Sequence, residues 1–217
     1  MFVTRRQRFQ FRQVHYGSRL AWPIRLHINN RRPRRTLRQQ WAAEIDMMQH
    51  KETTSDPARV AELIASIGAG IVLLDGCTQS GKATLGHCIC RRLGIDIVSL
   101  VDADQHLERK QGRYVGALRV DRLKEAIAWA SRRSPIVLLD GVCAREIAEC
   151  GEVTPTLSVY VQRNTSAGLK ADQDILDAEK GCGGDADLSS LDKEIYAYHA
   201  RHKPRRNADI IYIRVGD

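Results

Sequence analysis

The most specific pattern in this chain is the stretch Gly76-Cys77-Thr78-Gln79-Ser80-Gly81-Lys82-Ala83-Thr84. Two glycines five residues apart precede a lysine, between an apolar run and a segment with the composition of a helix. The glycines let the backbone curl so that its N–H groups point inward, and the start of the helix adds positive potential. The spacing G-x-x-x-x-G-K therefore predicts a loop that binds phosphate groups.

All nine residues of this stretch are candidate nucleotide contacts. Lys82 is expected to reach the outer phosphates, and a hydroxyl on the next residue normally holds Mg²⁺. That next residue is Ala83 here, and the first hydroxyl comes one step later. Thr84 is therefore the candidate metal ligand of the loop. Cys77 lies close to the expected helix N-terminus, which leaves a lowered thiol pKa and sensitivity to oxidation as one interpretation of this cysteine.

Short apolar runs alternate with segments of helix length along the rest of the chain. Strands are expected at Ile71–Leu74, Ile97–Val101, Ile136–Leu139, Leu157–Val161 and Asp209–Ile213. Helices are expected at Ala58–Ile67, Lys82–Leu93, Val120–Arg132, a short stretch after Ala144, Ser166–Glu179 and Leu191–Arg201. This alternation predicts an α/β fold, a doubly wound five-stranded parallel sheet with helices on both faces.

The hexapeptide Ile-Val-Leu-Leu-Asp-Gly occurs twice, at residues 71–76 and 136–141. It is too short to indicate a duplicated domain, and two central strands in the same buried environment explain it. Both copies place Asp-Gly at the carboxyl end of a strand, where open α/β sheets bind ligands. Asp140 is therefore a candidate Mg²⁺ ligand, whereas Asp75 either belongs to the same cluster or is a structural cap.

Two more acids follow the strand at residues 97–101, in Asp102-Ala-Asp104. A hydroxyl that accepts a phosphoryl group needs an acid at this kind of position to orient it and remove its proton. Asp104 is the first candidate for this base and Asp102 the second, although one of the two acids is equally suited to cap the next turn. Among the basic residues that follow, Arg113 and Arg119 are candidate contacts for an anionic acceptor.

The charge of the chain is concentrated at one end. Residues 1–46 contain eleven arginines, no lysine and two acids, a formal charge of +9, while the other 171 residues sum to −1. We expect residues 1–55 to be a basic, poorly ordered extension and residues 56–217 to be the nucleotide-binding domain. An arginine-rich tail could bind nucleic acid or an anionic surface, or serve as a mitochondrial presequence, but no specific role is the favoured interpretation.

The remaining features of the composition point to a cytoplasmic protein. No apolar run reaches the length of a membrane span, and the N-terminus has no apolar signal-peptide core. The six cysteines form neither a C-x-x-C pair nor a zinc pattern, and a nucleotide site without a secretion signal implies a reducing compartment. Nothing in the sequence specifies an oligomeric state.

The glycine-lysine loop, Asp102-Ala-Asp104 and Asp140-Gly141 together resemble the P-loop NTPase fold of small-molecule kinases. The segment from Tyr198 through Pro204 and Ala208-Asp209 into the last strand is similar to the uridine kinase and phosphoribulokinase branch. The resemblance covers about residues 70 to 215. It implies transfer of the γ-phosphoryl group of ATP, with Mg²⁺, to a hydroxyl of a nucleoside-like or other small molecule. The lid arginines of that family would correspond to Arg163 and Lys170.

Two functions of different classes follow from these observations. The first is an ATP-dependent small-molecule kinase, a phosphotransferase in which Lys82 and one of the acids at 102 and 104 are catalytic. The alternative is a non-catalytic nucleotide-binding or regulatory protein on a kinase fold. Ala83 in place of the usual hydroxyl, and a lid segment with only two basic residues, favour this alternative.

Overall fold

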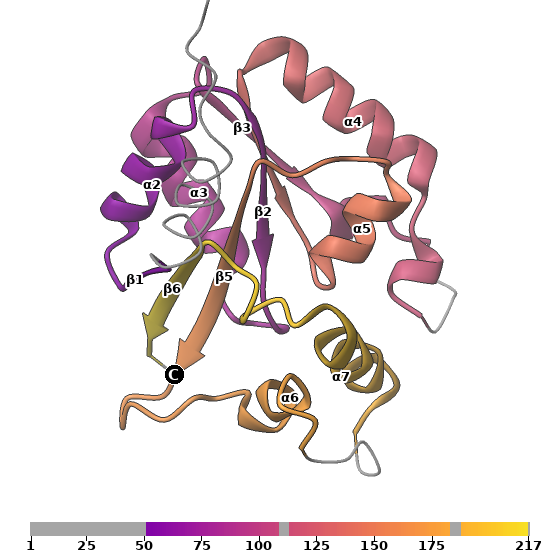
Figure 1. Ribbon diagram of the computed structural model, residues 1–217. Coiled ribbons are helices and arrows are strands. Elements are labelled where there is room, and N and C mark those ends of the chain that lie inside the picture. Colours follow the sequence, from indigo (N-terminus) through magenta and orange to yellow (C-terminus); the bar gives the residue numbers. More distant parts are fainter. Residues whose placement is uncertain (1–50, 109–112, 183–187, 217) are drawn as a thin grey trace, which may run out of the picture. The chain divides into compact units, whose positions relative to one another are not determined.

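The computed structural model of the protein describes residues 51–108, 113–182 and 188–216. Within these residues the chain forms one sheet of six parallel strands in the order β1-β6-β5-β2-β4-β3 (Figure 1). The strands are β1 (Glu52–Thr54), β2 (Gly70–Asp75), β3 (Val98–Asp102), β4 (Ile136–Asp140), β5 (Leu157–Asn164) and β6 (Ile210–Val215). The helices are α2 (Pro57–Ser66), α3 (Lys82–Leu93), α4 (Val120–Arg133), α5 (Ala144–Cys150), α6 (Gln173–Ala178) and α7 (Ser190–His202).

Strand β2, which leads into the glycine-lysine loop, lies between β4 and β5. The chain leaves β2 for β3 at one edge of the sheet and later crosses to β5 on the other side of β2. The carboxyl end of β2 therefore lies at the point where the strand order changes direction. Open α/β sheets bind ligands at this point.

The sheet has one strand more than the five that the sequence predicts. β1 has only three residues, so it carries no apolar run, and it lies at the sheet edge beside β6. The ammonium group of Lys51 donates to the backbone carbonyls of Arg205 and Arg206 next to this strand. β1 precedes residue 56, where we expect the nucleotide-binding domain to begin, and that division stays a prediction.

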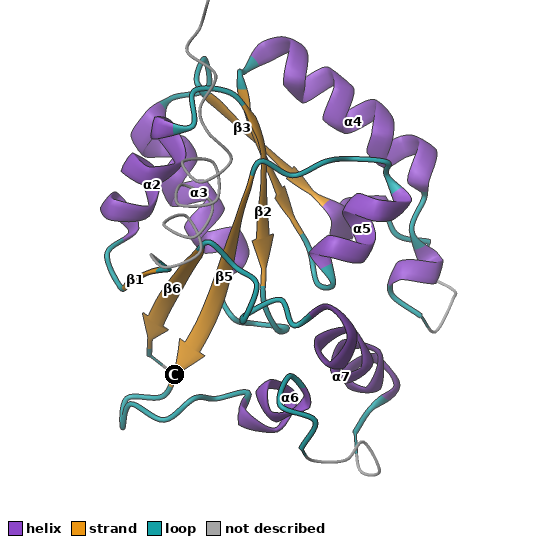
Figure 2. Cartoon of the chain, viewed as in Figure 1, coloured by secondary structure: helices purple, strands orange, loops and turns teal. Residues whose placement is uncertain are grey.

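Helices cover both faces of the sheet, which confirms the doubly wound fold (Figure 2). On one face, α2 and α3 bury Val60, Ile64, Leu85 and Ile89 against alternate residues of β2, β4 and β5. On the other face, α4 and α5 pack Leu123, Ile127 and Ile147 against the residues in between, such as Leu73 and Leu139. Strands buried on both faces explain the continuous apolar runs in the sequence.

The start of α2 agrees with its sequence signal. Asp56 is the N-cap, and its carboxylate accepts a 2.8 Å hydrogen bond from the backbone N–H of Ala58. Pro57 occupies the first turn, where its missing N–H needs no partner. A cap of this kind contributes about 1 kcal/mol to helix stability.

The two copies of Ile-Val-Leu-Leu-Asp-Gly lie in the neighbouring strands β2 and β4, but they are staggered by one residue. Ile71 pairs with Val137, and Leu74 pairs with Asp140. Side chains alternate between the faces of a sheet, so the stagger turns equivalent residues of the two copies to opposite faces. Val72 therefore packs below α2 and α3, whereas the equivalent Val137 packs below α4 and α5.

The helix expected at Ser166–Glu179 is wrong in its first half. The helix α6 covers only Gln173–Ala178, and the chain before it folds back in a turn that is closed by Gly168 at φ +79°. An antiparallel bridge between Asn164 and Lys170 follows from this turn. A glycine in the left-handed region interrupts a helix, which the apolar spacing of the segment does not reveal.

Helices α6 and α7 pack against each other beyond the carboxyl ends of the strands (Figure 1). They belong to neither helix layer of the sheet. Their position brings them over the loops that follow β2, β4 and β5, so that they cover the edge of the sheet at which ligands are expected.

The predictions about the basic tail concern residues 1–46 and the extension to residue 55, and residues 1–50 lie outside the described residues. Nucleic-acid binding and targeting by this segment therefore stay predictions. In the part of the chain that the structure describes, no helix has the length and apolar character needed to span a bilayer.

Candidate active site

The glycine loop, defined here as residues 76–84, has the backbone shape that its two glycines allow. Gly76 has φ +144°, and a Cβ on it would lie 2.5 Å from the carbonyl oxygen of Val161. Gly81 has φ +100°, and a Cβ there would lie 2.7 Å from Cδ of Arg214. Gly76 excludes other residues by conformation and by space, whereas Gly81 excludes them by conformation, because the side chain of Arg214 could move aside. Helix α3 begins directly after Gly81, so its first N–H groups face the loop.

The side chain of Lys82 is buried and lies across the start of this loop. Its ammonium group donates to the carbonyl oxygens of Gly76 at 3.0 Å and Cys77 at 2.8 Å. The N–H groups of Thr78 and Gly81 make no hydrogen bond to any other described residue. The loop thus presents a cation and unpaired N–H donors, which are the groups that bind an anion.

A cleft of about 440 Å³ opens between the glycine loop and the carboxyl ends of β3 and β4. It brings together most of the residues that the sequence singled out from three separate segments. Its walls consist of Thr78, Gln79, Gly81, Lys82, Ala83, Thr84, Asp102, Asp104, Asp140, Gly141, Val142 and Arg214. The predicted contacts that do not line it are Gly76, Cys77 and Ser80, which are buried beneath the loop surface.

Asp140 is a buried acid in the wall of this cleft. Its Oδ1 atom is inaccessible to solvent and has no hydrogen-bond partner among the described residues. Burial raises the pKa of this carboxyl to about 6, the charge of Lys82 opposes the rise, and the nearby Asp102 adds to it. An unpaired buried carboxylate is costly, so its presence at this position suits a cation that binds with the ligand.

The acids at 102 and 104 have different surroundings. Asp102 caps a short 3₁₀ helix, Ala103–His106, and accepts a 2.9 Å hydrogen bond from the N–H of Asp104. Asp104 accepts a hydrogen bond from the hydroxyl of Tyr114, which itself accepts one from the N–H of Val142 at 3.2 Å. The capping role that the sequence left open belongs to Asp102. Burial, with Asp104 beside it, raises the pKa of Tyr114 and keeps its hydroxyl protonated as a donor.

Two residues of the site were missed in the sequence. Tyr114 lies in an unpatterned segment, and nothing in the sequence associates it with Asp104. Arg214 lies at the carboxyl end of β6, packs on Gly81 and donates to the carbonyl of Gln79 at 3.3 Å. An arginine directly after the predicted strand at 209–213 was a usable signal, because ligand sites lie at these strand ends.

The two predicted acceptor arginines lie outside the cleft. Arg113 is exposed, and Arg119 is exposed and paired with Glu108 at 3.3 Å. Arg119 borders a separate surface hollow, together with Arg122 and Trp129. A role of either arginine in binding the acceptor stays a prediction. The cleft gives it no support, because neither side chain lines it.

The predicted lid residues lie at the end of β5 (Arg163) and after it (Lys170), and they also do not line the cleft. Arg163 pairs with Asp172 across a distance of 3.5 Å, and its Nε atom is buried without a hydrogen-bond partner among the described residues. Lys170 forms the backbone bridge to Asn164. Burial raises the pKa of Asp172, while Arg163 opposes that rise.

The interpretation of Cys77 as an acidic thiol is wrong. The side chain is buried, and this burial raises the pKa of the thiol to about 12. Its sulfur lies 3.7 Å from the hydroxyl of Tyr160 and 3.9 Å from Nε2 of His199. Burial disfavours the charged thiolate and so raises the pKa of Cys77. The positive potential of the helix N-terminus, which would lower this pKa, acts only near the first turn of α3 and is the smaller effect here.

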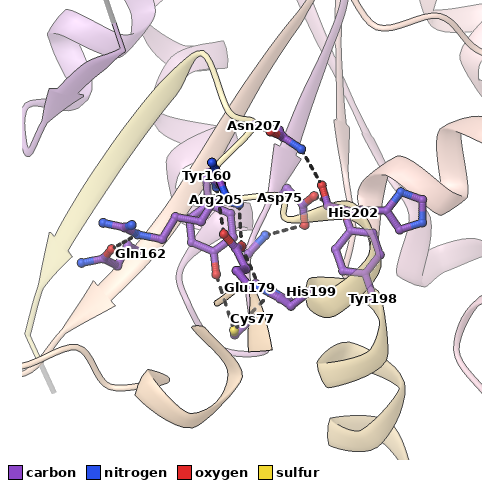
Figure 3. Close-up of polar contacts among 12 residues, drawn as sticks. Asp75, Cys77, Tyr160, Gln162, Glu179, Tyr198, His199, His202, Arg205 and Asn207 are labelled. Carbon is purple, nitrogen blue, oxygen red and sulfur yellow. Dashed lines mark hydrogen bonds and ion pairs between the residues drawn. The ribbon is translucent and has the colours of Figure 1, made fainter. Parts of the chain in front are cut away.

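Asp75 is a structural acid and does not line the cleft with Asp140. Its Oδ1 atom accepts a 2.8 Å hydrogen bond from the N–H of Gly76, and Oδ2 accepts one from the hydroxyl of Tyr198 on α7 (Figure 3). The one-residue stagger between β2 and β4 explains this difference. Asp140 shares a row with Leu74 on the α3 side of the sheet, so Asp75 points away from it.

The comparisons with known proteins agree with this architecture in part. No protein-family model matches the chain. Over 163 residues it is 25% identical to a shikimate kinase from Chlorobium phaeobacteroides (strain DSM 266 / SMG 266 / 2430), a match that covers 66% of this chain and 81% of the relative.

Two solved structures are similar to the chain at low sequence identity. A possible uridine kinase from Bacillus stearothermophilus has a TM-score of 0.47 and 15% identity, over 78% of this chain and 99% of that one. A thymidylate kinase from Candida albicans has a TM-score of 0.37 and 12% identity, over 68% of this chain and 84% of that one.

The chain has an α/β fold of the P-loop kind, with an all-parallel sheet, helices on both faces and the glycine loop between the central strand β2 and helix α3. In sequence it is similar to a kinase.

Proposed function

We propose that this protein is an ATP-dependent kinase that transfers a phosphoryl group to a hydroxyl of a small molecule. The observation that carries the proposal is the shared cleft. It places the lysine and free N–H groups of the glycine loop opposite three acids at the ends of β3 and β4. An anion-binding loop facing carboxylates is the arrangement that phosphoryl transfer needs.

In the proposed complex the glycine loop binds the phosphates of ATP. Lys82 would exchange its hydrogen bonds with the loop carbonyls for contacts to the outer phosphates, because ammonium–phosphate contacts are the stronger ones. Arg214 adds a second cation at the same wall. Together they would neutralise charge on the nucleotide without any rearrangement of the sheet.

The residues of the cleft fit a magnesium ion that is shared with the nucleotide. The supporting observation is that the buried Oδ1 atom of Asp140 has no hydrogen-bond partner in the described part of the chain. No group of three or more acidic, His or Cys side chains among the described residues could hold a metal alone. Asp140 and Thr84 would hold the ion jointly with phosphate oxygens, and its chemistry would be neutralisation of phosphate charge.

Transfer itself would use an acid of the 102–104 pair as the base. The acceptor oxygen forms its bond to the γ-phosphorus as the bond to the β,γ-bridging oxygen breaks, and ADP leaves. Asp104 takes the proton of the acceptor hydroxyl, and Tyr114 holds its carboxylate in place through a hydrogen bond. Asp102 is the weaker candidate, because its oxygens cap the 3₁₀ helix.

A second function has its own support in two features of the site. The lining residue after Lys82 is Ala83, and the lid arginine Arg163 is paired with Asp172 away from the cleft. Both features suit a regulatory protein that binds a nucleotide without turnover. ATP binding that does not require Mg²⁺, with no ADP released for any acceptor, would favour this function over the kinase.

The decisive experiment is an ADP-release screen of the full chain with Mg-ATP. The acceptor panel would contain nucleosides, sugars, ribosides and hydroxy acids, because the relatives leave the acceptor open. We expect ADP release above the rate of ATP hydrolysis for one chemical class. Equal rates with and without every acceptor would contradict the kinase.

Two substitutions assign the roles within the site. Lys82→Ala should weaken ATP binding by at least about tenfold, since a lost charge-assisted contact costs about 1.5–3 kcal/mol. Asp104→Asn should leave ATP binding near normal and lower transfer about 100-fold, the size of a general-base contribution. Titration calorimetry and turnover measurements check these values.

The matched controls are Lys124→Ala and Asp121→Asn, which change the same residue types on the exposed surface of α4. Both controls should behave as the wild type. An ATP affinity unchanged by Lys82→Ala would refute the loop assignment.

A further inference from the structure

Helix α7 contacts both halves of the proposed active site with side chains one helical turn apart. Glu194 and Tyr198 occupy positions i and i+4, so they lie on one side of the helix. Tyr198 reaches the strand end before the glycine loop, and Glu194 reaches the segment that carries Tyr114. Neither side chain lines the cleft.

Tyr198 acts on the glycine loop through Asp75. Its ring is buried, and its hydroxyl donates to Oδ2 of Asp75 and accepts from the N–H of Arg145 at 3.2 Å. The other carboxylate oxygen of Asp75 accepts the N–H of Gly76. Tyr198 thus determines the orientation of the carboxylate that holds the first residue of the loop.

Glu194 acts on the proposed base through Tyr114. Its two carboxylate oxygens accept the backbone N–H groups of Tyr114 at 2.7 Å and Val115 at 3.0 Å. Two charge-assisted hydrogen bonds fix this short segment, whose tyrosine hydroxyl donates to Asp104. The carboxylate of Glu194 therefore controls where the hydroxyl of Tyr114 points.

A buried polar network anchors α7 so that it can position both segments (Figure 3). His199 pairs through Nδ1 with the carboxylate of Glu179 at 3.1 Å, and that carboxylate also accepts the backbone N–H groups of Arg205 and Arg206, each at 2.9 Å. The rings of Tyr160 and Tyr198 meet the His199 ring edge to face. Satisfied buried networks of this kind are rigid.

We propose that Tyr198 and Glu194 are positioning residues of α7, the first for nucleotide binding by the glycine loop and the second for phosphoryl transfer by Asp104. The proposal rests on the proposed kinase function and goes beyond it, because it assigns separate kinetic consequences to two residues that touch neither substrate.

The test separates the two roles with Tyr198→Phe and Glu194→Gln in the full chain. Tyr198→Phe keeps the ring and removes the hydroxyl, so we expect Mg-ATP affinity to fall about tenfold with kcat within about twofold of the wild type. Glu194→Gln keeps the shape and removes the charge, so we expect kcat to fall about tenfold with ATP affinity unchanged.

Matched controls exclude a general loss of stability. Tyr196→Phe removes another tyrosine hydroxyl of α7, one that donates to the carbonyl of Cys182 at 3.0 Å, and Glu149→Gln neutralises an exposed acid on α5. Both controls should retain wild-type affinity and kcat. Thermal unfolding of all four variants measures how much stability each change costs.

Amide hydrogen exchange tests the proposal even if no acceptor is found. Tyr198→Phe should speed exchange at Gly76 and leave Tyr114 and Val115 unchanged, while Glu194→Gln should do the reverse. If the protein shows no turnover but each variant still changes exchange at its own segment only, the positioning roles stand and the kinase proposal alone is refuted. Equal effects of each variant at both segments, or effects no larger than those of the controls, would overturn the proposal.

Discussion

At the scale of single residues, the difference between Asp75 and Asp140 is the most informative comparison in the molecule. Both end the same pentapeptide, Ile-Val-Leu-Leu-Asp, in neighbouring strands. The one-residue stagger turns Asp140 toward the cleft and Asp75 toward α7. Asp75 therefore has a hydrogen-bond partner for each oxygen, whereas Asp140 keeps an oxygen without one among the described residues.

The raised pKa of Asp140 predicts that this residue lowers the folding stability at neutral pH, although the proposed function needs it. The folded protein holds this proton more tightly than the unfolded chain, with a pKa of about 6 against 3.8. The contribution of Asp140 therefore favours folding at low pH and is lost as pH rises from about 4 to about 6, at up to about 3 kcal/mol. Asp140→Asn should make the protein more stable than the wild type at pH 8, as measured by urea unfolding.

The same substitution should weaken Mg-dependent ATP binding, because it removes the proposed metal ligand. In the wild type this affinity should fall as pH drops below about 6, when Asp140 takes up its proton. Asp121→Asn, at an exposed position on α4, is the control for both measurements. An Asp140→Asn variant less stable than the wild type at pH 8 would contradict this account.

At the scale of elements, the end of β5 and the segment between β5 and α6 carry the two predicted lid residues, Arg163 and Lys170. Gly168 folds this segment back on itself, and Asp172 pairs with Arg163 at its base. The arginine is thereby held at the end of β5. To neutralise charge on a transferring phosphoryl group, its guanidinium would have to leave Asp172.

Substitutions in this segment test the lid. Arg163→Ala should lower kcat by at least about 100-fold with ATP affinity changed less than about threefold, because a lid arginine acts in the transition state. Asp172→Asn should raise kcat or leave it unchanged, since it releases the arginine. Steady-state kinetics with the acceptor from the screen measures kcat of both variants. Lys170→Ala, a change at the other predicted lid residue, is measured beside them for comparison. Equal kcat for Arg163→Ala and the wild type would remove Arg163 from the mechanism.

At the scale of the whole molecule, the distribution of charge separates the basic tail from the rest of the chain. Residues 1–46 carry +9 and the rest of the chain carries −1. The pI of about 9.4 is thus a property of the tail and says nothing about the ligand of the cleft. Long-range attraction of polyanions and binding of ATP should be separable functions.

Deletion of residues 1–46 should leave ATP affinity unchanged within about twofold. If the full chain binds RNA or anionic vesicles, that binding should disappear with the deletion and fall steeply between about 50 and about 200 mM salt, because it consists of phosphate contacts. Calorimetry measures the ATP affinity, and fluorescence anisotropy with labelled RNA measures the loss of RNA binding. RNA binding that survives the deletion would assign it to the rest of the chain.

Most elements of the fold could be predicted because their signals are local. Apolar runs bounded by turns predicted five of the strands, and the cap at Asp56 predicted the start of α2. β1 was missed because three residues make no pattern, and it exists only by pairing with β6. The first half of the helix expected at 166–179 does not form, because Gly168 in the left-handed region folds the chain back before Gln173.

The glycine loop could be predicted from local sequence, because two glycines and a lysine at fixed spacing need no distant partner to specify a phosphate-binding turn. The strand ends that carry acids could be predicted in the same way. The folded structure was needed to show which of these acids lies in the cleft, because that depends on the one-residue stagger of β4 on β2. It alone brought Arg214 and α7 to the glycine loop, and Glu194 of α7 to the segment of Tyr114, because contacts between residues 80 or more positions apart leave no trace in local sequence.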